Sequence, residues 1–217
     1  MLDWIVRSDG VPAVGDRTIE AGLRIVCALL LGFFAFSLPG CSKYNELVDK
    51  DQACQQAWVD VEAQMQRRYD LVPNLVATVK ASAAHEEKTL EAVTQARAEA
   101  TSIQLAPDDL EDPAKVAIFQ KAQDQLKGAL SRLLLTQEAY PDLKANAQFH
   151  DLMIELEGTE NRIARAREEY NKAVGAYNAT LAQIGGQIVN KATGKTFKSR
   201  VYFAASAGAE AAPKVSF

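Results

Sequence analysis

The 217-residue chain is poor in the residues that interrupt helices or that commonly build metal and catalytic sites. It has 12 glycines, 7 prolines, 3 cysteines and 2 histidines. It contains no Walker phosphate loop, GxSxG nucleophile elbow or EF-hand loop. The formal net charge of −4 gives no support for nucleic-acid binding. Hydrophobic residues make up 48% of the chain, which fits one helical domain with a sizeable core.

The two histidines lack the spacing of a zinc helix. That motif needs a second histidine four residues after the first, but Thr89 occupies this position relative to His85. His150 is far away in the sequence. A metal-dependent hydrolase built on clustered carboxylates is therefore the least favoured class. The sequence predicts a protein that is not an enzyme and that has no metal or cofactor.

An uncharged run at residues 25–38 follows Arg24 and leads into Leu38-Pro39-Gly40-Cys41. The run is shorter than the ~20 residues of a spanning helix and agrees with the ~7–15 residues of a signal-peptide core. The segment looks like a bacterial lipoprotein signal, in which Cys41 becomes the lipidated first residue of the mature protein. An uncleaved signal anchor is the alternative. In both cases we expect membrane attachment, with the rest of the chain on the periplasmic or extracytoplasmic side.

Cys54 is left without a partner in its own chain if Cys27 is removed with the signal and Cys41 is acylated. We therefore expect no intramolecular disulfide. Because Cys54 falls in an apolar pattern, it is expected to be a small buried hydrophobic residue. An intermolecular disulfide is the alternative.

Apolar residues recur every three or four positions over most of the chain, as in helices that bury one face. The expected helices cover residues 43–83, 86–104, 113–139 and 143–184. Asp112 and Asp142 are the expected N-caps of the last two, and Gly185-Gly186 is expected to end the last one. The first apolar seam is Tyr44, Leu47, Asp51, Cys54, Trp58, Val61, Met65, Arg68, Val72, Leu75 and Val79. The last seam is Leu152, Leu156, Thr159, Ile163, Ala166, Tyr170, Val174, Tyr177, Leu181 and Ile184.

The predicted fold is all-α, a long antiparallel up-and-down bundle of about four helices, because short connections make neighbouring helices antiparallel. The bundle occupies 42–185, after an N-terminal extension and signal segment at 1–41. An irregular tail at 186–217 is expected to dock partly through Val201-Tyr202-Phe203. Since the heptad phase continues through Pro73, we expect a kink there and a chain reversal near 82–85.

Charged residues interrupt the first seam and surround its proline. Asp51 and Arg68 can be buried and paired across helices, or can lie at the edge of the seam with their charges in water, which is the favoured interpretation. Arg67, Arg68 and Asp70 form a polar cluster beside Pro73. The cluster is either a patch that binds a partner or lipid headgroups, or a set of interhelical ion pairs that supports the kink.

Two Tyr-Asn pairs, Tyr170-Asn171 and Tyr177-Asn178, are seven residues apart. The tyrosines are expected in the seam with their hydroxyls at its edge. The asparagines beside them are weaker candidates for a self-association face.

Several short motifs occur in a fixed order along the chain: Tyr44-Asn45-Glu46-Leu47-Val48, Trp58, Arg67-Arg68-Tyr69-Asp70-Leu71-Val72-Pro73-Asn74-Leu75-Val76, His85-Glu86, Ala96-Arg97, Tyr140-Pro141-Asp142-Leu143-Lys144-Ala145-Asn146, Gly158-Thr159-Glu160-Asn161-Arg162-Ile163 and the two Tyr-Asn pairs. In order and spacing these motifs resemble the LemA family. The resemblance covers about 43–217. It implies a membrane-associated bacterial protein with a long antiparallel helical bundle, and it brings no catalytic residues.

The leading functional hypothesis is a membrane-tethered, non-enzymatic scaffold or interaction module of the cell envelope, whose partner is an unidentified envelope protein. The alternative is a binding module for an apolar or lipidic ligand held between the helices.

Overall fold

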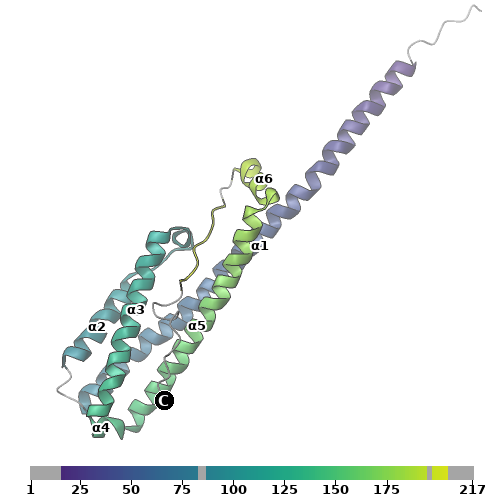
Figure 1. Cartoon of the computed structure of the whole chain (residues 1–217). Coiled ribbons are helices and arrows are strands. Elements are labelled where there is room, and N and C mark those ends of the chain that lie inside the picture. Colours follow the sequence, from purple (N-terminus) through teal and green to yellow (C-terminus); the bar gives the residue numbers. More distant parts are fainter. Residues whose placement is uncertain (1–15, 83–86, 195–196, 205–217) are drawn as a thin grey trace, which may run out of the picture.

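The computed structural model describes residues 16–82, 87–194 and 197–204, with side chains from Ser42 onward except at 82, 192 and 193. Within these ranges the chain is helical and has no strand, which confirms the all-α prediction (Figure 1). The α-helices are α1 (Asp16–Ser82), α2 (Glu87–Ser102), α3 (Pro113–Thr136), α4 (Pro141–Lys144), α5 (Ala147–Ala182) and α6 (Ile184–Thr193). Two 3-10 turns are η1 (Pro107–Glu111) and η2 (Gln137–Ala139).

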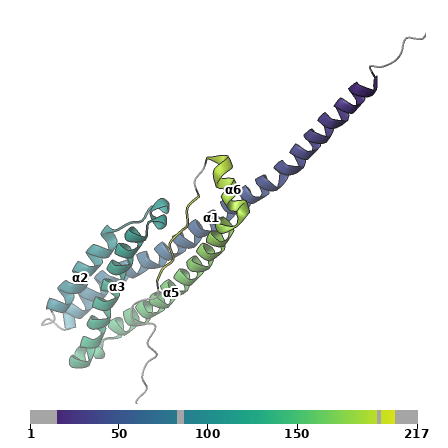
Figure 2. The same cartoon turned by 45° about the horizontal axis from the view of Figure 1, so that its top comes forward.

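Helix α1 is one continuous rod of 67 residues, which corresponds to about 100 Å. Its first part projects beyond the bundle, and its second part lies inside it (Figures 1 and 2). The apolar run 25–38 and Cys41 belong to the projecting part, and their side chains lie outside the described residues. No helix is long and apolar enough to cross a membrane, judged on the residues that the structure describes.

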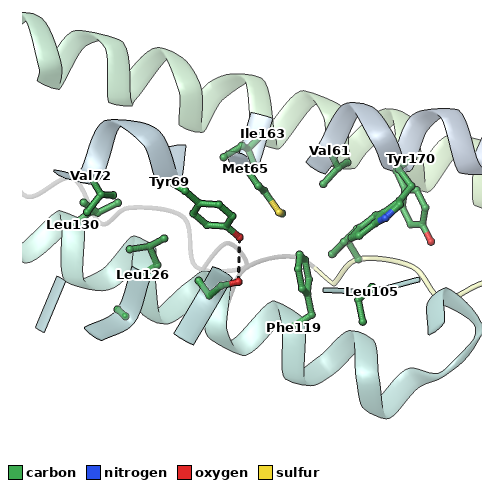
Figure 3. Packing of buried hydrophobic residues seen from close by; sticks show 14 of the residues in the cluster. Val61, Met65, Tyr69, Val72, Leu105, Phe119, Leu126, Leu130, Ile163 and Tyr170 are labelled. Carbon is green, nitrogen blue, oxygen red and sulfur yellow. Dashed lines mark hydrogen bonds between the residues drawn. The ribbon is translucent and has the colours of Figure 1, made fainter. Parts of the chain in front are cut away.

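The second part of α1 packs antiparallel against α5, as the two long seams predict. Trp58 on α1 and Ile163 on α5 are buried, and Leu181 is partly buried against the core. Figure 3 shows Val61 and Met65 of α1 in the interior, near Ile163. The prediction was wrong for Ile184, which is 78% exposed because the seam helix ends before it.

Helices α2 and α3 form a hairpin that packs side by side against the far half of α1. The apolar pattern of these two helices predicts an inward face, and most of its residues are buried: Leu90, Val93, Ala96, Ala100, Val116, Phe119, Leu126, Leu130 and Leu133. Ile103, which belongs to the same pattern, is partly buried. With 16 and 24 residues, these helices are about 24 and 36 Å long and cannot cover the whole α1–α5 pair. Residues 197–204, called the strap below, run along the part that the hairpin leaves open (Figure 2).

The N-cap prediction was right for α3 and wrong for α5. The Asp112 side chain accepts hydrogen bonds from the backbone of Ala114 and Lys115. Asp142 does not cap α5, because Pro141 starts the single turn α4 and the chain then bends again. Asn146 is the cap, and its Oδ1 accepts from the backbone N–H of Phe149 at 3.1 Å.

Helix α5 does not end at the two glycines. The chain leaves the helix at Gln183, whose φ and ψ are −66° and 155°, and Gly185 and Gly186 belong to the next helix, α6. Gly194 closes α6 in the left-handed conformation, with φ of 67°. The sequence pattern therefore missed α6, as it missed the single turn α4.

Pro73 lies within α1, which continues through it as a single helix to Ser82. The chain does not reverse at Pro73, as predicted, and the kink expected there stays a prediction. Helix α1 ends at Ser82 and α2 begins at Glu87, and the reversal predicted near 82–85 falls on residues 83–86, which lie outside the described residues.

Candidate functional site

Two asparagines on α5 hold the backbone of the strap. Asn178 accepts the Arg200 N–H at 3.0 Å and donates to the Arg200 carbonyl at 2.9 Å. Asn171 makes the same pair of bonds with Phe203, at 2.9 and 3.0 Å. One amide thereby satisfies both backbone groups of one strap residue, which a neighbouring strand does in a sheet.

A third asparagine repeats this arrangement on α6. Asn190 accepts the Phe197 N–H at 2.8 Å and donates to the Phe197 carbonyl at 2.9 Å. The Phe197 ring lies edge-on to Tyr44 of α1, with the ring centroids 6.0 Å apart. The start of the strap is thus fixed to both α6 and α1.

The two tyrosines of the Tyr-Asn pairs also bind the strap. The Tyr177 hydroxyl donates to the Lys198 carbonyl at 3.0 Å, and the Tyr170 hydroxyl donates to the Val201 carbonyl at 3.2 Å. The Val201 N–H donates to the Leu110 carbonyl of η1 at 2.8 Å. Both tyrosine rings are buried, as predicted, and their hydroxyls reach the strap.

The strap follows α1 in register. Seven helical residues rise about 10.5 Å, and three extended residues span about 10 Å, so a heptad on the helix matches every third strap residue. The matching pairs are Tyr44 with Phe197, Asp51 with Arg200 and Trp58 with Phe203. The same arithmetic explains why Asn171 and Asn178, seven apart, bind strap residues three apart.

Phe203 fixes the end of the strap in an aromatic cluster. Its ring stacks on Trp58 with 5.6 Å between centroids and 12° between planes. Tyr170 lies edge-on at 5.3 Å, and Phe119 is 6.4 Å away. The Arg167 guanidinium lies 4.8 Å above the Phe203 ring. The strap therefore contributes a side chain to the bundle core.

Arg200 fixes the middle of the strap by an ion pair. Its Nε and Nη2 donate to Asp51 Oδ1 at 2.9 and 2.6 Å, and its Nη1 donates to the Pro107 carbonyl at 3.0 Å. Burial lowers the pKa of Arg200, but the bonds and the charge of Asp51 outweigh this and leave that pKa raised. Nearby Cys54 is buried, as predicted, and burial raises the pKa of its thiol to about 11.

Arg68 is buried and paired, so the expectation that its charge lies in water was wrong. Its side chain is 2% exposed, and Nη1 donates to Glu160 of α5 at 2.8 Å. Its Nη2 donates to Gln123 of α3, and Gln123 in turn donates to the Tyr69 hydroxyl at 2.6 Å. The network joins α1, α3 and α5, and a buried arginine needs such partners because its charge is otherwise costly.

Pro73 leaves one backbone carbonyl of α1 without its helical hydrogen-bond donor, and a side chain of α2 supplies the donor. Proline has no backbone N–H, so the carbonyl four residues earlier, at Tyr69, has no helical donor. Arg97 on α2 donates to this carbonyl through Nε at 2.8 Å. Pro73 and Arg97 are 24 positions apart in the sequence. The proline removes the usual donor to the Tyr69 carbonyl, and the arginine replaces it.

The predicted cluster of Arg67, Arg68 and Asp70 is divided by the structure. Arg67 and Asp70 are exposed, and Arg68 points into the bundle. Arg67 pairs with Glu155 of α5 at 3.2 Å, and Asp70 accepts from Gln66 at 2.7 Å. Partner binding at the two exposed residues stays a prediction, as does lipidation of Cys41, whose side chain lies outside the described residues.

The described residues contain no group of three or more His, Cys, Asp or Glu side chains placed to hold a metal ion. His150 is exposed, and His85 lies outside the described residues. A depression of about 210 Å³ between α3 and α5 is lined partly by Leu130, Leu134 and Met153. Its volume is below the ~300 Å³ of typical small-molecule sites. Larger hollows of about 770 Å³ between α2 and α3 and about 690 Å³ between α1 and α2 are lined by many polar and charged side chains. A ligand held between the helices stays a prediction.

Sequence reasoning missed the strap contacts of Asn171, Asn178 and Asn190, and it missed Arg200 entirely. The amides of Asn171 and Asn178 are occupied within the chain by the strap. A signal was present, because the seven-residue repeat of the Tyr-Asn pairs matches Phe203 and Arg200, three residues apart. An extended segment without alternating apolar residues gives no periodicity of its own.

A family model for the LemA family matches residues 57–217 of the chain. The chain belongs to the LemA family. The match covers every residue of the α5, α6 and strap contacts described above, and it begins within α1, after Tyr44 and Asp51.

Curated relatives of this LemA-family chain include magnetosome proteins. Magnetosome protein MamQ 1 of Paramagnetospirillum magneticum is 27% identical over 206 residues, which cover 88% of this chain and 74% of that protein. MamQ of Magnetospirillum gryphiswaldense is 26% identical over the same shares. Protein LemA of Metamycoplasma hominis is 27% identical over 153 residues, covering 70% of this chain and 65% of that protein.

Proposed function

We propose that this chain is a membrane-tethered, non-enzymatic helical scaffold of the bacterial cell envelope. The observation that carries the proposal is the continuity of α1, which runs as one helix from the region of the apolar run 25–38 to Ser82. Because the same helix supplies the seam of the bundle, the membrane segment and the folded body are mechanically one element. Family membership and the bacterial relatives support this assignment.

The tether has two chemical forms in this proposal. If the signal is cleaved, lipid chains on Cys41 hold the bundle, and two or more chains give a stable anchor. If it is not cleaved, residues 25–38 remain in the bilayer as a signal anchor. In both forms the bundle lies on the periplasmic or extracytoplasmic side.

The bundle offers partners a rigid, charged surface. Arg67 and Asp70 are exposed near the far end of α1, and Arg68 holds that part of α1 to α3 and α5 from inside. We propose this face as the contact for an envelope protein. Self-association is a second outcome that the same crosslinking experiment detects.

The tether is tested by intact-mass measurement of the protein purified from membranes. A lipidated form has a mass that begins at Cys41 plus its acyl chains, and Cys41→Ser leaves the mass of the precursor. An anchored form retains residues before Cys41 and is insensitive to Cys41→Ser. Recovery of unmodified protein in the soluble fraction would contradict both forms.

The scaffold role is tested by photocrosslinking in intact cells from positions 67 and 70, with position 161 on α5 as an exposed control. We expect a defined protein adduct from 67 or 70. Monomer alone from all three positions would count against a scaffold.

A further inference from the structure

Helix α6 carries two exposed isoleucines on successive turns. Ile184 is 78% exposed and Ile188 is 56% exposed. Four residues separate them, so they lie on one face of the helix, and Lys191 extends this face by another turn. The opposite face is buried and includes Gly186 and Val189. The exposed side of α6 therefore carries two isoleucines beside Gln187 and Lys191, and the bundle does not cover them.

Helix α6 lies close to the point where α1 leaves the bundle. A side chain at Gly185 would meet Cγ of Lys43 at 3.3 Å, so α6 packs against α1 where α1 enters the bundle. Figures 1 and 2 show α6 at the end of the bundle from which α1 projects. Lys43 is five residues after Leu38, the last residue of the apolar run, which is about 7.5 Å along a helix.

That distance is within the depth at which amphipathic helices contact a bilayer. Such helices bury their apolar face roughly 5–10 Å into the boundary between headgroups and acyl chains, and lysine on the same helix favours anionic lipids. Ile184 and Ile188 supply the apolar residues, and Lys191 supplies the cation.

We propose that α6 is a second membrane contact, in which Ile184 and Ile188 insert at the headgroup boundary of the same bilayer that holds the α1 tether. The proposal rests on the proposed tether, because only a tethered bundle brings α6 to that depth. A tether alone lets the bundle swing about its attachment. A tether together with the α6 contact fixes the orientation of the bundle on the membrane.

The chain offers a matched control at the other end of the bundle. Leu135 on α3 is 72% exposed and Ile154 on α5 is 57% exposed, close to the values for Ile184 and Ile188. Ile154 precedes Ile184 by 30 residues, nearly all within α5, which places it about 45 Å from the α6 end. Exposed apolar side chains at that end do not reach a membrane bound by α1.

The test places the photoreactive residue p-benzoylphenylalanine at position 188 or at position 135 of the full chain. Each protein is reconstituted into vesicles of phosphatidylcholine and phosphatidylglycerol, floated on a density gradient, irradiated and analysed by mass spectrometry. We expect both proteins to float and a lipid adduct to form several-fold more at 188 than at 135. In the 188 protein, Ile184→Asn should lower the adduct yield, and Ile154→Asn should leave it unchanged.

The outcomes separate this inference from the tether. Flotation with no lipid adduct at 188 overturns the α6 contact and leaves the tether in place. A protein–protein adduct at 188 instead of a lipid adduct also overturns it, because another chain then covers the face. Failure to float overturns the tether and the α6 contact together. Thermal melts of all variants check that the bundle is folded.

Discussion

Arg200 of the strap and Asp51 of α1 form an ion pair across 149 positions of sequence, with Nη2 and Oδ1 2.6 Å apart. The arginine side chain is 3% exposed, so its charge depends on this partner. The pair ties the last described segment of the chain to the start of the bundle. It lies midway between two aromatic contacts, Phe197 with Tyr44 and Phe203 with Trp58.

We expect Arg200→Met to lower the free energy of unfolding by about 3 kcal/mol, because it leaves the Asp51 carboxylate without its cation. The double variant Asp51→Leu/Arg200→Met should be less destabilised than Arg200→Met, since no unpaired charge remains. Urea titrations measure both. Glu168→Gln, which removes an exposed pair with Lys172, is the control and should cost less than about 1 kcal/mol. Equal losses of unfolding free energy in the single and double variants would show that the unpaired Asp51 charge does not cause the destabilisation.

Phe203→Ala should destabilise the bundle by about 3–5 kcal/mol, because it removes a buried ring from the cluster around Trp58. The neighbouring substitution Tyr202→Ala removes a ring that is 49% exposed, and should cost less than about 1 kcal/mol. In a Trp4→Phe background, Trp58 is the only tryptophan, and its fluorescence should shift to longer wavelength in Phe203→Ala only. An unchanged spectrum would place Phe203 away from Trp58.

Arg97→Met should cost about 1–3 kcal/mol, since the Tyr69 carbonyl then lacks a donor. In a Pro73→Ala background, the alanine N–H can serve that carbonyl, so the same substitution should cost less. A double-mutant cycle on urea midpoints measures this coupling. Arg132→Met, at an exposed position of α3, should change stability by no more than about 0.5 kcal/mol. Additive effects of Pro73→Ala and Arg97→Met on stability would show that Arg97 does not replace the donor that Pro73 lacks.

Stability should fall at high pH. Burial raises the pKa of Cys54 from 9.0 to about 11 and the pKa of Tyr177 from 10.0 to about 12. The folded chain therefore keeps these protons at pH values where the unfolded chain loses them. The stabilisation is fully present below about pH 9 and is lost as pH rises through the folded-state values.

The free energy of unfolding, measured at a series of pH values, should therefore decline above pH 9. Cys54→Ala should make the decline between pH 9 and pH 11 shallower, because the contribution of the buried thiol is gone while those of the buried tyrosines remain. Cys27→Ala, before the bundle, should leave the decline unchanged. A Cys54→Ala curve parallel to the parent curve would show that the thiol does not contribute.

Periodicity predicted the long seams because a helix that buries one face must repeat its apolar residues. Trp58, Ile163 and Val174 are buried for that reason. Periodicity could not predict the start of α5. There Tyr140-Pro141 begins a separate turn, and Asn146 is the N-cap that was expected at Asp142. Asp142 and Asn146 are both residue types that cap helices, and only Asn146 directly precedes the long helix.

Charged seam residues were predicted less well for a different reason. Whether Arg68 and Asp51 face water depends on groups that are distant in sequence: Gln123 and Glu160 for Arg68, and Arg200 for Asp51. Asn171 and Asn178 likewise bind a segment that has no repeat of its own. The strap contacts can be predicted only when the α2–α3 hairpin is known to be too short to cover α1. The number of helices does not reveal this.

Residue-resolved amide hydrogen exchange of the strap tests most directly the claim that it completes the bundle. The N–H groups of Arg200, Val201 and Phe203 donate to Asn178, Leu110 and Asn171, so they should exchange slowly. The N–H groups of Lys198 and Tyr202, which have no acceptor among the described residues, should exchange faster. Asn178→Ala, which removes the acceptor of the Arg200 N–H, should speed exchange at Arg200, and Asn161→Ala on exposed α5 surface should not. Fast exchange throughout 197–204 would contradict the account.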